Sequence, residues 1–308
     1  MTECDRILTK GVIPAAFLKE ETRCGFFVDT TRKKLWTIQL DLLMELDRIC
    51  KNNGLQYFAA YGTLLGAVRH QGFIPWDDDA DVWMLRDDYN KLSSISNQFS
   101  SPYFLQNAET DPNYFMSFSK LRNDNTTCVR KTNICQGFHA GISIDIFPLD
   151  NTVPATGQEI YNRIKYLNME NSTYMRMKDP NPSEEDKRRI SMWSKIHPQE
   201  AYNEIQNLAQ KNRNIETEHV SKVVCTIYPY GKDILKKEWF KDQSLLEFES
   251  MKIPVPIGYR EVLSQIYGEY MKFPPLNERG SWHPNSKLII DPDIPYSIKI
   301  NALLNNSN

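Results

Sequence analysis

Four aspartates crowd into positions 77 to 81 of this chain, between residues that are otherwise apolar. They are Asp77, Asp78, Asp79 and Asp81, in the stretch IPWDDDADVW. Residues 79–85 are predicted to form a β-strand, in which alternate side chains share a face, so Asp79 and Asp81 point the same way about 7 Å apart. Two carboxylates this close repel each other unless a cation, a proton or an arginine lies between them. The fold must therefore bring positive charge to this strand.

A divalent metal ion is the commonest such charge, and hard oxygen ligands suit Mg²⁺ or Mn²⁺. The stretch GISIDIFPLD, residues 141–150, is a second predicted strand, with isoleucines on one face and Asp145 on the other. We predict that Asp79, Asp81 and Asp145 bind the metal of a phosphoryl-transfer site, whose substrate carries a diphosphate. Asp77 precedes Asp79 by two residues, so in an extended chain it lies on the same face as Asp79 and Asp81. It is a further catalytic candidate. A solvated acidic turn is the alternative.

A second motif, AAYGTLLG, precedes the aspartates. A β-prone run ends at Gly62, and a short helix is predicted to follow from Thr63. Backbone N–H groups and a hydroxyl at a helix N-terminus bind phosphate. A strand, Gly-Thr, a helix and then Asp-x-Asp about seventeen residues later is the pattern of nucleotidyltransferase folds.

Composition excludes several classes of protein. The net charge of −2 lacks the basic excess of a nucleic-acid-binding protein. No run of apolar residues is long enough to span a membrane, and the N-terminal residues do not read as a secretory signal. The six scattered cysteines are predicted to be free thiols in a reducing compartment. We therefore expect a cytoplasmic protein.

Secondary-structure patterns predict an α/β protein of the α+β type in three parts. Residues 1–150 mix strands and helices in a nucleotidyltransferase-like core with a mixed sheet. Residues 151–221 form a mainly helical subdomain. Residues 222–308 pack back on the core, with strand-and-loop patterns at 222–231 and 246–259 and a last helix at 259–271. Within the first part, apolar residues at helical spacing predict a helix that ends at Gly54.

Three stretches together resemble the LicD/fukutin-type phosphotransferases. They are YGTLLGAVRHQGFIPWDDDADV, SIDIFPLD and YGEYMKFPP, spread over residues 61–275. The resemblance is closest to bacterial, LicD-like members. It implies transfer of a phospho-alcohol, with phosphocholine from CDP-choline as the first expectation, to a hydroxyl of a surface glycan such as teichoic acid or lipopolysaccharide, or to its polyprenyl-linked precursor. CDP-ribitol and CDP-glycerol are the alternative donors.

The resemblance also assigns residues. The metal carboxylates carry over to Asp79, Asp81 and Asp145, and Gly62 and Thr63 match the Gly-Ser/Thr phosphate loop. The acceptor hydroxyl attacks the phosphorus distal to the nucleoside, while Asp145 or Asp77 orients or deprotonates it. CMP then leaves.

Basic residues near the motifs are candidates for phosphate contacts. Arg69 follows the Gly-Thr helix, and Lys120 and Arg122 alternate on one predicted strand. Surface salt bridges are the alternative for all three. Basic residues in the helical block suit a solvated helix face, with peripheral contact at the inner face of a membrane as the alternative. Aromatic residues near the motifs, Tyr61, Phe73, Trp76 and Trp83, are predicted to be core, with stacking on cytosine or caging of a quaternary ammonium as the alternative.

Three rival functions share parts of this pattern. A D-x-D glycosyltransferase would place its motif after a longer nucleotide-binding domain and leaves the Gly-Thr loop unexplained. A nucleotidyltransferase would move the NMP part, which only the product reveals. A non-catalytic scaffold gains nothing from the repulsion among the carboxylates.

Overall fold

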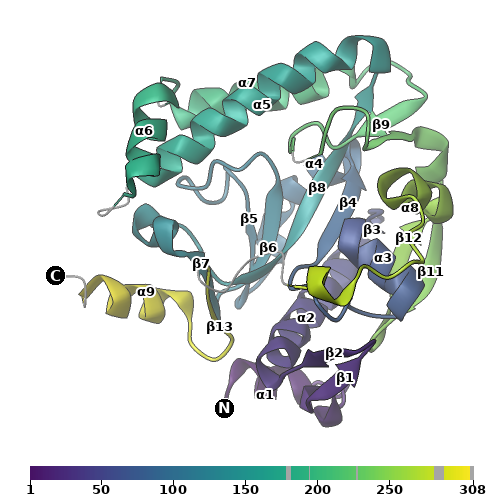
Figure 1. The fold of residues 1–308 in the computed structure, drawn as a ribbon, viewed down its shortest axis with the longest axis vertical. Helices are drawn as coiled ribbons and strands as arrows, with labels where there is room; N and C mark the ends of the chain where they lie inside the picture. The colour runs from purple at the N-terminus through teal and green to yellow at the C-terminus, as the bar shows by residue number, and fades with distance from the viewer. Residues whose placement is uncertain (178–181, 194, 227, 281–287, 306–308) are drawn as a thin grey trace.

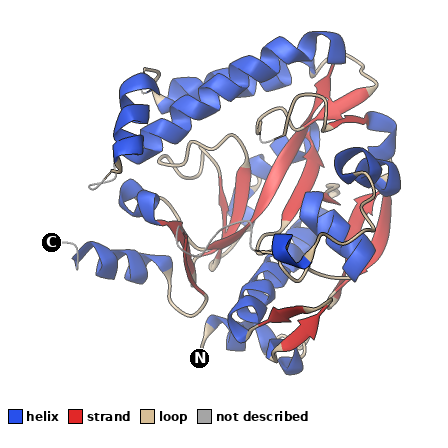
Figure 2. Ribbon diagram, in the orientation of Figure 1, coloured by secondary structure: helices blue, strands red, loops and turns tan. Residues whose placement is uncertain are grey.

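A mixed sheet with helices packed around it forms the body of the protein (Figure 1). The computed structural model describes residues 1–177, 182–193, 195–226, 228–280 and 288–305. Helices and strands are interspersed along the chain, which confirms the predicted α/β class (Figure 2).

Seven strands make up the central sheet, and β8 is its hub. β8 runs parallel to β4 on one side, while on its other side it pairs antiparallel first with β6 and then with β9. The strands are β3 (Phe58–Ala59), β4 (Asp81–Leu85), β5 (Tyr103–Gln106), β6 (Ser119–Asn123), β8 (Ile142–Thr152), β9 (His219–Ser221) and β10 (Ile234–Lys236). Both directions of pairing occur, so the sheet is mixed, as predicted.

The helix α2 (Thr30–Asn53) packs against β6 and β8. Its N-cap is Asp29, whose side chain accepts a hydrogen bond from the backbone N–H of Arg32. It ends at Gly54, which has the left-handed conformation that favours glycine. The predicted helix and its stop are thus confirmed. Two shorter helices flank the site region, α3 (Tyr61–His70) and α4 (Arg86–Ser94).

Three helices follow β8, as the composition of that region predicts. They are α5 (Pro154–Met177), α6 (Glu184–Trp193) and α7 (Pro198–Ala209), and α5 and α7 lie side by side along the top of Figure 1. Ile164 and Ile205 from this block belong to the same hydrophobic core as the sheet. The domain boundaries at residues 150 and 221 stay a prediction. None of the helices in the described ranges is long and apolar enough to cross a membrane.

Of the two strand-and-loop patterns in the C-terminal part, the second is confirmed by β11 (Gln243–Phe248) and β12 (Met251–Pro256), while the described residues of 222–231 form only turns and loop. The prediction of the last helix is wrong. The helix α8 (Tyr259–Tyr267) is not the last one, since α9 (Tyr296–Asn305) follows it. The remaining short strands form three pairs: β1 (Glu21–Arg23) with β2 (Phe26–Val28), β11 with β12, and β7 (Thr127–Arg130) with β13 (Leu288–Asp291).

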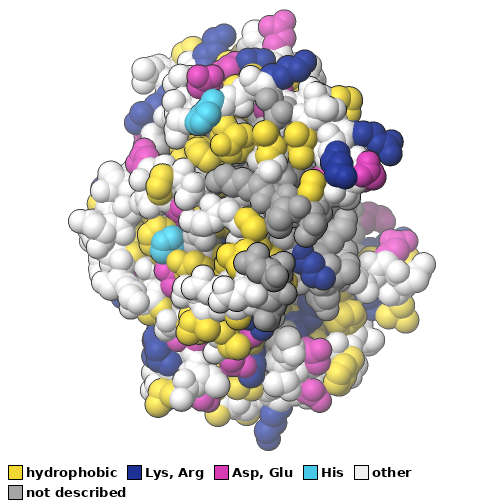
Figure 3. All heavy atoms as spheres, turned by 90° about the vertical axis from the view of Figure 1, so that its left-hand side faces the viewer, with side chains coloured by type: hydrophobic (Ala, Val, Ile, Leu, Met, Phe, Trp, Pro, Cys, Tyr) yellow, Lys and Arg dark blue, Asp and Glu magenta, His cyan; other side chains and the backbone are white. Residues whose placement is uncertain are grey.

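Hydrophobic side chains gather across the middle of the face that carries α6 and α9 (Figure 3). Met192 on α6 is 58% exposed and Ile298 on α9 is 61% exposed. Most of the lysines and arginines of this face lie toward its edges (Figure 3).

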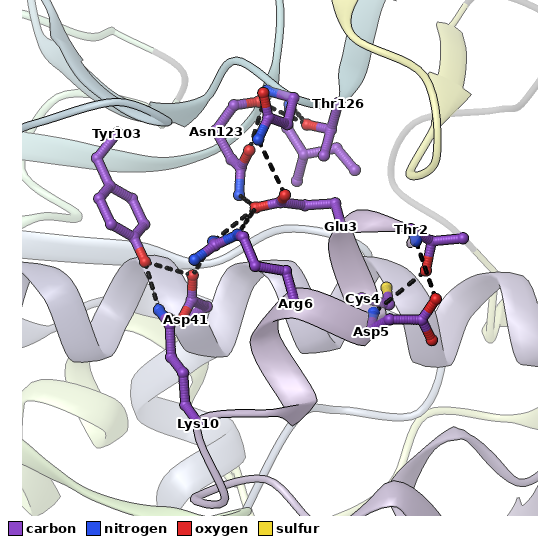
Figure 4. Close-up of polar contacts among 12 residues, drawn as sticks. Thr2, Glu3, Cys4, Asp5, Arg6, Lys10, Asp41, Tyr103, Asn123 and Thr126 are labelled. Atoms are coloured by element: carbon purple, nitrogen blue, oxygen red, sulfur yellow. Dashed lines mark hydrogen bonds and ion pairs between the residues drawn. The ribbon is translucent and has the colours of Figure 1, made fainter.

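The first helix, α1 (Glu3–Leu8), is tied to the sheet by a buried carboxylate (Figure 4). Glu3 accepts hydrogen bonds from Arg6 Nε at 2.9 Å, Asn123 Nδ2 at 2.7 Å and Asn125 Nδ2 at 3.0 Å. Burial by itself raises the pKa of Glu3, but these donors outweigh it and hold the pKa below its ordinary value. On α2, Asp41 joins the same network by accepting from Arg6 at 3.3 Å.

Candidate active site

The loop between α3 and β4 carries the aspartates, and side chains of α2 hold its backbone. Arg32 Nη1 donates to the carbonyl of Asp77 at 2.6 Å, and Trp36 Nε1 donates to the same carbonyl at 3.3 Å. Gln39 Nε2 donates to the carbonyl of Asp78 at 3.0 Å. The loop is thus fixed at two successive peptides.

Asp79 lies before the strand rather than in it. The strand β4 begins at Asp81, so the predicted alternation of Asp79 and Asp81 along one strand is wrong. Instead, each of Asp77, Asp78 and Asp79 places a carboxylate oxygen within 4.8 Å of the others. The cluster is therefore built by a loop, and Asp81 adjoins it from the start of the strand.

Gly62 makes room for one member of this cluster. A Cβ atom at residue 62 would lie 2.4 Å from Asp77 Oδ2, closer than any real contact. The backbone N–H of Asp78 donates to Asp77 Oδ1 at 3.1 Å and orients the same carboxyl group. The phosphate-binding role of Gly62 stays a prediction. The close approach of Asp77 is a further reason for glycine at this position.

Asp81 and Asp145 are neighbours in the sheet, as predicted. They are register partners on the parallel strands β4 and β8, and Lys120 on β6 is the register partner of Asp145 on its other side. Lys120 Nζ forms an ion pair with Asp145 Oδ1. Asp81, Asp145 and Lys120 thus lie side by side across three neighbouring strands.

Thr63 positions the first of these carboxylates. The hydroxyl oxygen of Thr63 accepts a hydrogen bond from the backbone N–H of Asp81 at 2.8 Å, and Thr63 is only 4% exposed. The helix α3 begins at Tyr61, two residues earlier than predicted, so Thr63 lies inside its first turn. Direct contact of Thr63 with phosphate stays a prediction.

The carboxylates repel one another strongly. Removal from water raises the pKa of Asp77 well above its ordinary value, and the charge of Asp79 and a hydrogen bond shared with that carboxyl group raise it further. The pKa of Asp81 is raised by the same loss of water and by the charges of Asp79 and Asp145. A divalent cation would relieve this repulsion, and an all-carboxylate donor set suits Mg²⁺ or Mn²⁺. The residues therefore fit the metal, although the ligand set Asp79, Asp81 and Asp145 stays a prediction.

Two of the three candidate phosphate-binding cations hold protein backbone. Arg69 Nη1 donates to the carbonyls of Tyr270 at 2.8 Å and Lys272 at 3.3 Å. Arg122 is 5% exposed and donates to Gln106 Oε1 at 2.5 Å and to the carbonyl of Gly141 at 2.6 Å. A phosphate contact by either residue would require it to leave these partners. Lys120 is likewise paired with Asp145, and all three phosphate contacts stay predictions.

The aromatic residues near the motifs belong to the core, as predicted. Tyr61, Phe73 and Trp83 are at most 5% exposed and Trp76 is 9% exposed. The ring of Tyr61 packs edge-on against Trp83 with centroids 4.7 Å apart.

The sequence reasoning missed Lys222 and Asp233. Lys222 is 3% exposed, and its ammonium lies over the ring of Tyr61 at 4.3 Å. Tyr61 also donates a hydrogen bond to Asp233 at 3.4 Å. Both residues come from segments about 150 residues beyond the aspartates. No local pattern could have identified them, because the contact is made by the return of the chain through β9 and β10.

Comparisons with known proteins agree with this site. Residues 54–162 match the family description "LicD/FKTN/FKRP, nucleotidyltransferase domain". Over 272 residues the chain is 28% identical to the lipopolysaccharide cholinephosphotransferase LicD of Haemophilus influenzae. The alignment covers 84% of this chain and 98% of that protein. The chain is thus similar to the LicD family within residues 54–162, and to one LicD protein over most of its length. The match of residues 54–162 to LicD contains the aspartate loop, β4 and Asp145, whereas Lys222 lies beyond it.

A shorter similarity involves a second organism. A segment of 58 residues is 43% identical to an uncharacterized protein of Rickettsia prowazekii, over 19% of this chain and 22% of that protein. It adds no functional information to the LicD match.

Proposed function

We propose that this chain transfers phosphocholine from CDP-choline to a hydroxyl group of a surface glycan, or of its lipid-linked precursor, and releases CMP. The observation that carries this proposal is the alignment with the Haemophilus cholinephosphotransferase over 98% of that protein. The carboxylate cluster supports it, because it is suited to a metal-bound diphosphate.

The reaction exchanges one phosphorus–oxygen bond for another. The acceptor oxygen forms a bond to the phosphorus that carries choline, and the bond from that phosphorus to the bridging oxygen breaks. CMP leaves with the electron pair, and the acceptor proton passes to a carboxylate. Mg²⁺ bound by Asp79, Asp81 and Asp145 would neutralise charge on the phosphoryl oxygens.

Two carboxylates are candidates to orient or deprotonate the acceptor hydroxyl. Asp145 Oδ1 is engaged by Lys120, which orients this carboxylate for a hydroxyl at Oδ2. The carboxyl group of Asp77 shares a hydrogen bond with that of Asp79 and is held against Gly62. Each group thus has a neighbour that orients it, as a proton acceptor requires.

Product analysis tests the proposal. The protein is incubated with Mg²⁺, CDP-choline and a lipooligosaccharide that lacks phosphocholine, and the products are identified by mass spectrometry and ³¹P NMR. We expect phosphocholine on the glycan and one CMP per transfer. Transfer from CDP-ribitol or CDP-glycerol instead would keep the chemistry and change the donor. Release of phosphocholine with CMP attached to the acceptor would identify a nucleotidyltransferase.

We also propose that the enzyme works at the cytoplasmic face of a membrane, where a lipid-linked acceptor would lie. Exposed Met192 on α6 and exposed Ile298 on α9 support contact through the face that carries these two helices, and α6 adds Arg188 and Arg189. Flotation with anionic vesicles tests this. Met192→Asp should reduce the bound fraction, whereas unchanged binding of that variant would contradict contact through this face.

A further inference from the structure

Lys222 is a buried cation that forms no conventional polar contact. It is 3% exposed and directly follows β9. Across the described ranges of the chain, its ammonium has no hydrogen bond and no ion pair within 4.0 Å. An ammonium that is removed from water without a partner is costly, so its position calls for a physical reason.

Three aromatic rings hold the ammonium in place. Lys222 Nζ lies 4.3 Å from the ring centroid of Tyr61, 4.4 Å from that of Phe147 and 5.9 Å from that of Tyr228. Attraction between a cation and ring faces offsets part of the lost hydration while leaving the three N–H donors of the ammonium uncommitted. Tyr61 adopts a positive φ of 41°, a strained conformation that persists only where its surroundings enforce it.

The ammonium lies on the same face of the sheet as Asp145, because Phe147, whose ring it contacts, follows Asp145 by two residues on β8. Its charge lowers the pKa of Asp81 and of Asp233, although removal from water is the larger effect and leaves both pKa values above the ordinary value. The ring of Tyr228 also lines a cavity of about 480 Å³ with Tyr161 and Tyr230. The ring of Tyr228 thus belongs both to the cage around Lys222 and to the wall of this cavity.

The other cations near the site already have polar partners. Lys120 is paired with Asp145, while Arg69 and Arg122 donate to backbone carbonyls. Lys222 therefore differs from them in having all its donors available beside the carboxylates.

We propose that Lys222 binds the diphosphate of the donor and stabilises the negative charge that develops on the departing nucleotide phosphate. The inference rests on the proposed function, and it adds a residue outside the matched family segment. An ammonium held by ring faces needs no rearrangement when the diphosphate arrives, which is the preorganisation that electrostatic catalysis requires. The ligand would be a diphosphate that carries one or two organic groups.

Calorimetry in Mg²⁺ with two ligands, CDP-choline and inorganic pyrophosphate, tests the assignment. Lys222→Met keeps the length of the side chain and removes its charge. Lys232→Met is the matched control, because Lys232 lies 4.9 Å from the ring of Tyr228 but is exposed. We expect Lys222→Met to weaken both ligands by about tenfold or more, and to lower kcat more than it raises KM. The control should stay within about twofold of the wild type.

The outcomes separate this inference from the proposed function. Pyrophosphate binding that depends on Lys222, without any binding of CDP-choline, would overturn the donor and keep the role of Lys222. CDP-choline binding and turnover that are unchanged in Lys222→Met would overturn the role of Lys222 and keep the donor. Failure of the wild type to bind either ligand would overturn both.

A second measurement covers the case in which Lys222→Met does not fold. The side-chain ¹⁵N resonance of Lys222 in the wild type, assigned with Lys222→Arg, should shift on addition of pyrophosphate. Lys222→Arg should also retain most of the affinity, because it keeps the charge. An unmoved resonance at saturating pyrophosphate would mean that the ammonium serves only the folded structure.

Discussion

Asp81 on β4 lies beside Asp145 on β8, in the parallel register of two neighbouring strands. The two carboxylates differ in one respect, because Asp145 has an ion-pair partner in Lys120 while Asp81 has none of its own among the described residues. Removing the charge of Asp81 should therefore raise the free energy of unfolding, whereas removing the charge of Asp145 should not.

Asp81→Asn should stabilise the metal-free protein and abolish transfer. Asparagine keeps the shape of the side chain and removes a charge that Asp79 and Asp145 repel. We expect a gain of about 1 kcal/mol in the free energy of unfolding, or a rise of about 2 °C in Tm, measured in EDTA. Asp145→Asn is the comparison and should not stabilise, because it loses the pair with Lys120. A lower Tm for Asp81→Asn than for the wild type would contradict the repulsion.

Two glycines of α3 should respond differently to alanine. At Gly62 the added Cβ meets the carboxylate of Asp77, a side chain that is able to move, so activity should fall while stability changes by less than about 1 kcal/mol. At Gly66 the Cβ would lie 2.4 Å from the backbone oxygen of Gly72, and the free energy of unfolding should fall by about 1–3 kcal/mol. Urea unfolding and turnover of both variants check this. Equal losses of stability would refute the distinction.

The buried ion pair of Arg86 and Asp150 should contribute strongly to the free energy of unfolding. Arg86 Nε and Nη2 donate to the two carboxylate oxygens of Asp150 at 2.6 Å and 2.7 Å, and the residues are 5% and 1% exposed. Asp150→Ala leaves the guanidinium buried and unpaired, which should cost about 3–5 kcal/mol in urea unfolding. The double replacement Arg86→Met with Asp150→Ala should recover part of that loss. If the double variant is as unstable as the sum of the single ones, the pair is not coupled.

His70 should make stability depend on pH. Burial, and next the positive charge of Arg69, lower its pKa from 6.5 to about 4. Between these values the unfolded chain binds a proton that the folded chain does not, so the free energy of unfolding falls as the pH falls through this window. Arg69 Nε donates to His70 Nε2 at 3.0 Å, a hydrogen bond that the protonated ring could not accept.

The corresponding variant is His70→Gln, compared with the wild type by urea unfolding at pH 7 and pH 4.5. The loss of stability between these two values should be smaller in the variant. His197→Gln, at an exposed histidine, is the control. The same loss in all three proteins would exclude His70 as the cause.

Local patterns predicted the elements whose geometry is set by their own residues. The helix α2 follows from its apolar spacing and Gly54, and the position of Asp145 follows from the alternation along β8. The neighbourhood of Asp81 and Asp145 was predictable because both strands are largely apolar and each carries one of these two carboxylates.

What escaped prediction depends on contacts between distant segments. Asp79 was assigned to a strand, but β4 pairs with β3 only at Val82 and Trp83, and the loop before it is shaped by Arg32, Trp36 and Gln39 of α2. The strand-and-loop pattern at 222–231 contains no strand in its described residues, because β9 ends at Ser221. Lys222 reaches the site only through that return of the chain.

The most direct test of the central claim is calorimetric titration of the wild type and of Asp79→Asn with CDP-choline, CDP-ribitol, CDP-glycerol and UDP-glucose, each with and without Mg²⁺. The account predicts that CDP-choline binds best, that its binding requires Mg²⁺, and that Asp79→Asn loses it. A preference for UDP-glucose, or CDP-choline binding that is indifferent to both Mg²⁺ and Asp79, would contradict a metal-dependent phosphocholine transferase.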